Sequence, residues 1–503
     1  MYIRHFIWTT NCVLDLFDEI SLLRMLPAWI QMSGDDDLES TALIYLVLAI
    51  GIDAATEGDE NVAHDYYQYG RHLTANRLLA MGPSIYTTQC DVLITWYLLG
   101  NSQSNAAYMH IGTAIRAAYT LDLHKKPVAG SWKSDESHAR ERLWKSIRVL
   151  DGFLSQALGR PTMNQADGND DRLHGHYSAV SDLCTIFETV RDLVYAKRVV
   201  SFEVVQQIGT KHRRWSNLFR NGLEADCISS ADTVTINGRP HPNLGLYYLK
   251  EAYFWTVSQL TLPFLIDLVS ERILEQQYVN SRHPKFEHEG DRRHLAVHAC
   301  IDAAVNTLDM IQQLMSHQGA LPRRMPIVVN SVFFSALTIG FAVFGDLDYE
   351  WPLMRYLGLA RTILLQLAIH DSVAQEQVEV VTALQKACDN FLCRRSHRGL
   401  ESCTSKSSNI FGNIRERWQM ADCSPMTNST IRDHTGPMLS SDYVSHDPTK
   451  VLCHPSKVGL LDSGGGIVNL WGLSHTGDAE EEVVFPPFGG QDWTNMESLD
   501  IIS

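Results

Sequence analysis

Two histidines, His294 and His298, stand four residues apart in a segment of helical pattern, so both side chains would lie on one face of a helix. With this spacing a metalloprotease helix presents two zinc ligands. Leu295, however, occupies the position where such an enzyme carries its general-base glutamate, and the sequence offers no obvious third ligand. We therefore interpret this pair as the polar edge of a helix and not as a zinc site.

Four residues of zinc-binding type, Cys388, Cys393, His397 and Cys403, gather in a second segment. Their spacing fits no zinc module, and single cysteines commonly serve as small core residues. None of the ten cysteines is separated from another by just two residues, which excludes the thiolate pairs of zinc clusters and thioredoxin-like sites. Nucleophile elbows, phosphate loops and dinucleotide-binding glycines are also absent. We expect no catalytic residue, no metal site and no cofactor in this chain, and hence no enzyme.

Two short basic runs allow two interpretations. Residues 211–214 read Lys-His-Arg-Arg, and Arg394, Arg395 and Arg398 form the second run. Runs of this kind serve as nuclear localisation signals, and equally short runs form solvated helix faces. The sequence leaves both interpretations open.

The composition is that of a soluble globular protein. The 503 residues are 45% hydrophobic and 20% charged, enough for one large core or two ordinary ones. The net charge of −16 argues against electrostatic binding of nucleic acid by the chain as a whole. The cysteines are scattered, which favours reduced thiols in the nucleus or cytosol, and Arg4, His5 and Asp15 interrupt any signal-peptide core.

The segment 327–344 raises the question of a membrane, because it carries no charged residue and reaches the lower length limit of a spanning helix. Asn330, Ser331, Ser335 and Thr338 lower its hydrophobicity, and no basic or aromatic belt marks both of its ends. We therefore favour a buried core helix and expect no membrane partner.

Most of the chain to about residue 395 has helical periodicity separated by short breakers, which predicts an all-α fold of antiparallel helices. Residues 88–99 form an apolar helix that ends at Gly100 and Asn101, and Asn105 is expected to cap the next helix. The connection between the two helices is short, so we expect them to pack antiparallel. The apolar face of the second helix consists of Tyr108, Ile111, Ile115 and Ala118.

A longer helix is expected to follow the break at residues 127–130, with Ser134 as its cap. Its end is well specified, because Gly159 stands where a left-handed residue is needed and Pro161 prevents the helix from resuming. The buried stripe of this helix is expected to consist of Leu143, Ile147, Leu150, Leu154 and Leu158.

From residue 396 to 503 the chain is rich in Ser, Gly, Asn, Thr and Pro, a composition typical of a disordered tail. Its end, residues 458–503, is acidic and contains no Lys or Arg. Aromatic residues are interleaved with the acidic ones. Acidic residues keep such apolar groups solvated until a partner offers a groove, which is the physical logic of an activation segment. The candidate contact residues are Phe485, Phe488, Trp493, Leu499 and Ile501.

An ordered series of motifs between residues 88 and 161 resembles the fungal-specific transcription factor domain, the middle homology region of fungal binuclear zinc-cluster regulators. The segment up to Gln31 resembles the start of the same domain. The series consists of Thr88-Gln89, Tyr108, Gly112, Ala114-Ile115-Arg116, Leu121 to His124, Arg140-Glu141-Arg142-Leu143-Trp144, Leu150-Asp151, Leu154-Ser155 and Leu158-Gly159-Arg160-Pro161.

This resemblance implies an all-helical regulatory domain over residues 1–395, which controls a zinc cluster and in some members responds to small-molecule inducers. We expect structural roles for the motif residues: Trp144 in the core, Gly159 as a helix cap, and Arg160 paired with Asp151 to fix the following loop. The motif residues to which we assign such roles are Arg116, Trp144, Asp151, Gly159, Arg160 and Pro161.

The six-cysteine cluster, its basic linker and dimerising heptads are missing from these 503 residues. Either a cluster is encoded upstream of Met1, in which case zinc is expected there, or the protein regulates without contacting DNA.

We therefore expect a regulator of RNA polymerase II transcription that contacts co-activators through its tail. We expect it in the nucleus, either there alone or in the cytoplasm as well. DNA would be reached through a missing or partner module, including a homo- or heterodimer with a zinc-cluster protein. A metabolic gene cluster is a common target in the family. The alternative is a helical ligand-sensing or protein-interaction module that has lost its DNA-binding function.

Overall fold

The computed structural model describes residues 1–17, 19–31, 38–125, 134–163, 177–195, 199–277, 287–317, 321–412 and 483–484. The chain divides into two compact units. Unit 1 comprises Met1–Cys388 together with Gly464–Ile502, and unit 2 comprises Asp389–Ser463 together with Ser503.

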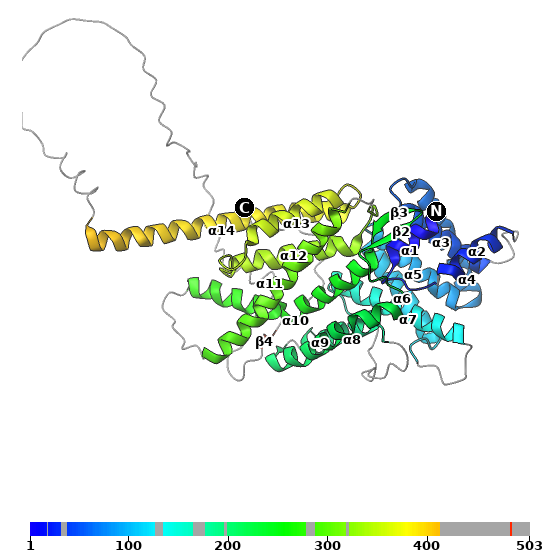
Figure 1. The fold of residues 1–503 in the computed structure, drawn as a ribbon, viewed down its shortest axis with the longest axis horizontal. Helices are drawn as coiled ribbons and strands as arrows, with labels where there is room; N and C mark the ends of the chain where they lie inside the picture. Colours follow the sequence, from blue (N-terminus) through cyan, green and yellow to red (C-terminus); the bar gives the residue numbers. More distant parts are fainter. Residues whose placement is uncertain are drawn as a thin grey trace, which may run out of the picture. The chain divides into compact units, whose positions relative to one another are not determined.

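The described part of the chain is helical, which confirms the expected all-α fold class (Figure 1). A short π-helix, Arg191–Tyr195, extends α8. The α-helices are α1 (Tyr2–Thr10), α2 (Glu19–Gln31), α3 (Leu38–Ala54), α4 (Glu60–Met81), α5 (Ile85–Gly100), α6 (Ser104–Thr120), α7 (Ser134–Ala157), α8 (Ala179–Val190), α9 (Phe202–Ala225), α10 (Leu244–Gln277), α11 (Glu287–Met315), α12 (Pro326–Phe344), α13 (Leu353–Leu367) and α14 (Ser372–Phe411).

Strands are a minor element of the described residues. The hairpin of β2 (Thr233–Ile236) and β3 (Arg239–Pro242) turns at Asn237 and Gly238, both of which have a positive φ. The pair β1 (Val199–Val200) and β4 (Val483–Val484) is antiparallel and two residues long.

Helices of unit 1 pack mainly on their neighbours in sequence, from α3 on α4 to α12 on α13. Two helices connect segments that are distant in sequence: α1 packs on both α3 and α10, and α10 also packs on α8, α11 and α12. Helix α10 therefore joins the helices before residue 163 to those after residue 287.

Helix α12 is a core helix, as expected for segment 327–344. It packs on α10, α11 and α13, and Val332, Ala336, Ile339 and Val343 have almost no exposed surface. By length and composition alone α12 and Leu244–Ile273 of α10 could cross a membrane, but 67% and 61% of the respective apolar windows are buried inside the protein. Burial of this extent is typical of core helices.

The predicted helix at 88–99 is present as α5, which begins three residues earlier. Its start is a capping box, in which the Ser84 hydroxyl accepts from the Thr87 amide and the Thr87 hydroxyl accepts from the Ser84 amide. The prediction that Asn105 caps α6 is wrong, because α6 begins at Ser104 and its N-cap is Gln103. The Asn105 side chain instead accepts a hydrogen bond from Arg160.

Helix α14 begins in unit 1, where the Asp371 carboxylate accepts from the amides of Val373 and Ala374 at 2.9 and 3.1 Å. It continues through residues 396–411, which we expected to belong to the disordered tail. No proline interrupts this stretch, and the helix ends where Gly412 adopts a φ of 78°. The predicted disorder beyond Gly412 lies outside the described residues, apart from Val483 and Val484.

Candidate functional site

Helix α7 carries the last part of the motif series, and its two faces have different surroundings. On one face Leu143, Ile147, Leu150 and Leu154 are completely buried, as the predicted stripe requires, and α7 packs on α5, α6 and α8. Leu158, the last member of the predicted stripe, is half-buried. We call this the packed face of α7.

The end of α7 is a Schellman motif built on Gly159. Gly159 has a φ of 61°, and the amides of Gly159 and Arg160 donate to the carbonyls of Gln156 and Ser155 at 3.2 and 2.8 Å. The predicted left-handed glycine is thus observed. The turn directs the chain back across α6.

The segment after this turn is tied to α6 and α7 by a set of contacts that we call the clasp: Asn105, Tyr108, Asp151, Arg160 and Pro161. The Tyr108 hydroxyl donates to the Pro161 carbonyl at 2.8 Å. The Asp151 carboxylate, which is buried, accepts from the backbone amide of Met163 at 3.4 Å. The clasp therefore fixes residues 161–163 against both helices.

Arg160 does not pair with Asp151, so that prediction is wrong. Its guanidinium donates to the side-chain amide oxygen of Asn105 at 2.6 Å and lies over the Tyr108 ring, 5.0 Å from the centroid. The physical reason is the Schellman turn, which points Arg160 towards α6 while Asp151 remains inside α7. Asp151 still fixes the loop, through Met163.

Two other motif residues lie nearer the surface. Trp144, expected in the core, is half-buried, and its ring lies edge-to-face with Tyr119 at 5.8 Å. Arg116 is exposed on α6 and donates to the carbonyl of Gly112 at 3.3 Å.

The second face of α7 borders a cavity of about 120 Å³. Arg148, Val149, Gly152 and Phe153 line it, at the spacing of one helix face. We call this the cavity face of α7. The opposite walls come from α8, α10, Ile327 of α12, the turn after α1 and Thr162.

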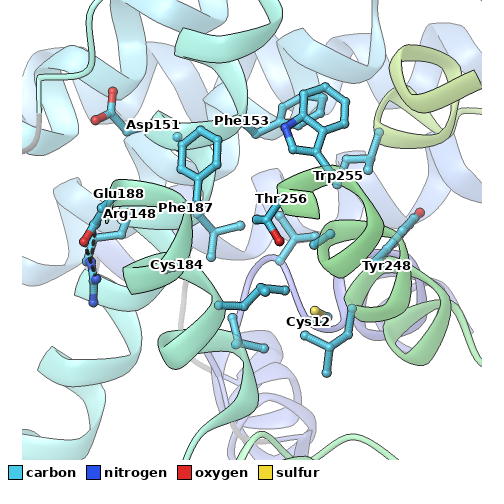
Figure 2. Close-up of a pocket in the computed structure, with 18 of the residues that line it drawn as sticks. Cys12, Arg148, Asp151, Phe153, Cys184, Phe187, Glu188, Tyr248, Trp255 and Thr256 are labelled. Carbon is cyan, nitrogen blue, oxygen red and sulfur yellow. Dashed lines mark hydrogen bonds and ion pairs between the residues drawn. The ribbon is translucent and has the colours of Figure 1, made fainter. Parts of the chain in front are cut away.

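Three aromatic rings, those of Phe153, Phe187 and Trp255, gather along one side of the cavity (Figure 2). Phe187 approaches α7 closely where Gly152 has no side chain, because a Cβ there would lie 3.1 Å from a Phe187 ring carbon. Trp255 is stacked on Phe334 with ring centroids 5.3 Å apart.

Charged groups at the cavity are engaged with protein partners. Arg148 and Glu188 form a two-point ion pair, with N–O distances of 2.9 and 2.8 Å, at the edge of the cavity in Figure 2. Arg191 donates to Asp192 at 2.8 Å and to the Thr162 hydroxyl at 2.5 Å. Through Thr162 the cavity therefore reaches the loop that the clasp holds.

Glu251 is a buried carboxyl group on the α10 wall. Burial raises its pKa to about 7, and its hydrogen bond with the Ser331 hydroxyl opposes this shift. Cys12 and Cys184 also line the cavity. Burial raises the pKa of the Cys184 thiol to about 12 and that of Cys12 well above its usual range, so neither is a thiolate nucleophile at neutral pH.

A buried ion-pair network positions α7 next to the cavity. The Lys145 ammonium lies 2.8 Å from Asp15 and 3.0 Å from Asp226. The Asp226 carboxylate also accepts from the Ser178 hydroxyl and the Val180 amide, at 2.6 and 2.9 Å. These carboxylates raise the pKa of Lys145 against the opposing effect of burial. One lysine thus holds the turn after α1, the start of α8 and the end of α9.

The two histidines of the α11 pair have different surroundings. His298 lies 2.7 Å from Glu350 and its ring lies 4.5 Å from that of Trp351, whereas His294 is exposed. Within the described residues no group of three or more His, Cys, Asp or Glu could hold a metal ion.

The loose cysteine group of α14 is also spread out. In unit 1 Cys388 is buried, and its thiol contacts the Gly340 carbonyl oxygen at 3.9 Å. In unit 2 Cys393 and Cys403 are exposed, and His397 lies beside Glu401.

The first basic run is only partly available at the surface. His212 is buried, lies 2.9 Å from the Thr256 hydroxyl, and has a pKa lowered to about 4 by burial. Arg213 and Arg214 are exposed, as are Arg394 and Arg398 of the second run. The tail residues Phe485, Phe488, Trp493, Leu499 and Ile501 lie outside the described residues.

The cavity was not predicted from the sequence. Its walls come from segments as far apart as Cys12, Cys184 and Trp255, and apolar residues that line a hollow follow the same periodicity as those that fill a core. A usable signal was the small residue Gly152 on a helix otherwise rich in large apolar residues.

Comparison with known proteins places residues 20–173 in a family. They match the model described as the fungal specific transcription factor domain. Over 137 residues the chain is 27% identical to an uncharacterized transcriptional regulatory protein of Schizosaccharomyces pombe, and over 145 residues it is 26% identical to the thiamine repressible genes regulatory protein of the same yeast. Over 98 residues it is 33% identical to the transcription factor asqA of Emericella nidulans.

These alignments cover 27%, 27% and 20% of this chain and only 18%, 18% and 17% of the respective relatives. The matched residues 20–173 include α5 to α7, with the clasp and the packed face of α7. Residues 20–173 are thus similar to the fungal specific transcription factor domain, and the chain spans less than a fifth of the length of these relatives.

Proposed function

We propose that this chain is the regulatory part of a fungal regulator of RNA polymerase II transcription. The observation that carries the proposal is the family match over residues 20–173, together with relatives that are named as transcriptional regulators. The matched segments span less than a fifth of those relatives, so the activity of the whole protein is inferred from its domain.

The division of tasks follows from charge and composition. With a net charge of −16, the chain itself is a poor ligand for a phosphate backbone, so DNA is reached through a zinc cluster outside this sequence or through a partner protein. Zinc belongs to that module alone. The helical body of unit 1 receives signals, and the acidic aromatic segment 458–503 recruits co-activators in the nucleus.

The test is to tether the chain to a promoter by fusing residues 1–503 to a heterologous DNA-binding domain in a fungal reporter strain. We expect reporter transcription to change at least fivefold relative to the DNA-binding domain alone. Deleting residues 458–503 should remove most of an activating effect, and replacing both Phe488 and Trp493 by Ala should reduce it in the same direction.

Deletion of residues 413–457 is the matched control, since it shortens the tail by a similar length and retains the acidic aromatic end. Unchanged reporter transcription with a nuclear, folded fusion would contradict the proposed function. Equal effects of the two deletions would contradict the role of residues 458–503 only. The alternative of a module that has lost its DNA-linked function is not favoured by relatives named as regulators.

A further inference from the structure

The cavity beside α7 has walls suited to an aromatic guest. Phe153, Phe187 and Trp255 line it with their rings (Figure 2), and Trp255 is stacked on Phe334. Preformed aromatic walls favour a ring that can adopt offset or edge-to-face contacts. The protonated thiols of Cys12 and Cys184 add a soft, polarisable surface of low polarity.

The charges around the cavity disfavour a charged guest. Arg148 is engaged by Glu188 through two contacts, and Arg191 by Asp192 and Thr162. A charged ligand would lose its hydration and would have to break one of these pairs to gain a counter-charge.

The two remaining carboxyl groups are also engaged. Asp151 accepts from the Met163 amide and from the Ser155 hydroxyl, and in Figure 2 its carboxylate points away from the three rings. Glu251 is hydrogen-bonded to Ser331 of α12. The interior that faces a guest is therefore mainly apolar, and the charged groups at its edge are already hydrogen-bonded or ion-paired within the protein.

The size of the cavity limits the guest. Its volume is about 120 Å³. A dry apolar cavity of roughly 150 Å³ in another protein holds benzene. A single aromatic ring matches this volume, and because the cavity is partly open, a small substituent can extend out of it.

We propose that this cavity binds a small, uncharged molecule built on a single aromatic ring, and that this molecule is an inducer of the regulator. The second part rests on the function proposed above. The walls come from α7, within the matched domain, and from α8 and α10, which lie beyond it. A guest adds apolar contacts between these helices and therefore favours the packing seen here over looser arrangements.

The experiment measures binding to the purified full-length chain by isothermal titration calorimetry and by the thermal unfolding midpoint. The probes are benzyl alcohol, benzoate and benzylammonium, which share one ring and differ in charge. We expect benzyl alcohol to bind at least tenfold more tightly than either ion and to raise the midpoint.

Ala252→Phe places a ring in the cavity, because Ala252 lines it on α10, and should weaken benzyl alcohol binding at least tenfold. Ala75→Phe is the matched control at an exposed position of α4 and should bind as the wild type does. If Ala252→Phe does not fold, Cys184→Met, which narrows the cavity from α8, replaces it.

No binding of benzyl alcohol, equal affinity for the three probes, or undiminished binding by the cavity variants would overturn the proposal. Binding to the purified chain needs no promoter, so a failed reporter experiment and a failed ligand experiment are distinguishable. If benzyl alcohol binds but leaves reporter transcription unchanged, the cavity is a ligand site and its role as an inducer site is wrong.

Discussion

The two faces of α7 differ in packing: one is tightly packed against neighbouring helices, and the other borders a cavity. On the packed face, Leu143, Ile147, Leu150 and Leu154 lose all solvent contact, and the clasp secures the end of the helix. On the cavity face, Phe153 remains half-buried beside a hollow of about 120 Å³. A closely packed interior cannot change without cost, whereas a hollow can accept a guest.

The largest expected effect concerns the ion pairs that hold α7 in place. Lys145→Met should lower the free energy of unfolding by about 4 kcal/mol, because it leaves the buried Asp226 carboxylate without its cation. Urea denaturation followed by circular dichroism measures this.

Lys125→Met is the control for that variant, because Lys125 and its partner Asp122 are largely exposed to solvent. It should leave the midpoint unchanged within error. Equal stability of the two variants would show that the network around Lys145 does not hold α7.

The second prediction compares the two faces directly. Leu150→Ala should destabilise the protein by about 3 to 4 kcal/mol, because Leu150 is fully buried and its neighbours cannot collapse into the space. Val149→Ala, one position away on the cavity face, should cost less than about 1 kcal/mol, since part of its side chain already borders empty space. Similar costs in urea denaturation would remove the distinction between the faces.

The sequence predicted the packed face more completely than the cavity face, for a physical reason. The leucine stripe and the Gly159 cap depend on local periodicity and backbone conformation, which neighbouring residues specify. The cavity depends on how α8 and α10 pack around α7, and no local sequence pattern specifies that packing.

The predictions for Asn105 and for the end of the last helix were wrong because each was made from local sequence alone. Asn105 has the residue type of a helix cap, yet tertiary structure uses its side chain to bind Arg160. The end of the last helix was placed too early because Ser-rich composition favours disorder, whereas residues 396–411 contain no proline and continue α14.

The third prediction concerns Glu251 on the wall opposite α7. Because burial raises its pKa from 4.5 to about 7, the folded state binds a proton that the unfolded state releases between these values. The contribution of Glu251 to the free energy of unfolding is therefore greatest below pH 4.5 and is lost as the pH rises through 7. The change in the free energy of unfolding is about 3 kcal/mol.

Glu251→Gln should therefore match the wild type near pH 4.5 and exceed its stability at pH 8. The difference between the two proteins isolates Glu251 from other titrating groups, including His212. A difference that does not vary with pH would show that Glu251 is ionised inside the folded protein.

The smallest expected effect concerns the turn that begins the clasp. Gly159→Ala should cost about 1 kcal/mol, because Gly159 has a φ of 61°, which an L side chain rarely adopts. Gly209→Ala, inside α9 with no atom within 4 Å of the new methyl group, should instead stabilise by about 0.5 to 1 kcal/mol. Thermal unfolding distinguishes the opposite signs, and equal signs would contradict the assignment of Gly159 as the helix stop.

The most direct test of the central claim, that this chain regulates transcription, is chromatin immunoprecipitation of the tagged chain from its own cells, combined with transcript profiling after its deletion. We predict enrichment at a limited set of promoters whose transcripts change on deletion, whether the chain reaches them through its own DNA-binding module or through a partner. A chain that is expressed and folded but enriched at no promoter, with transcripts unchanged by its deletion, would contradict the account.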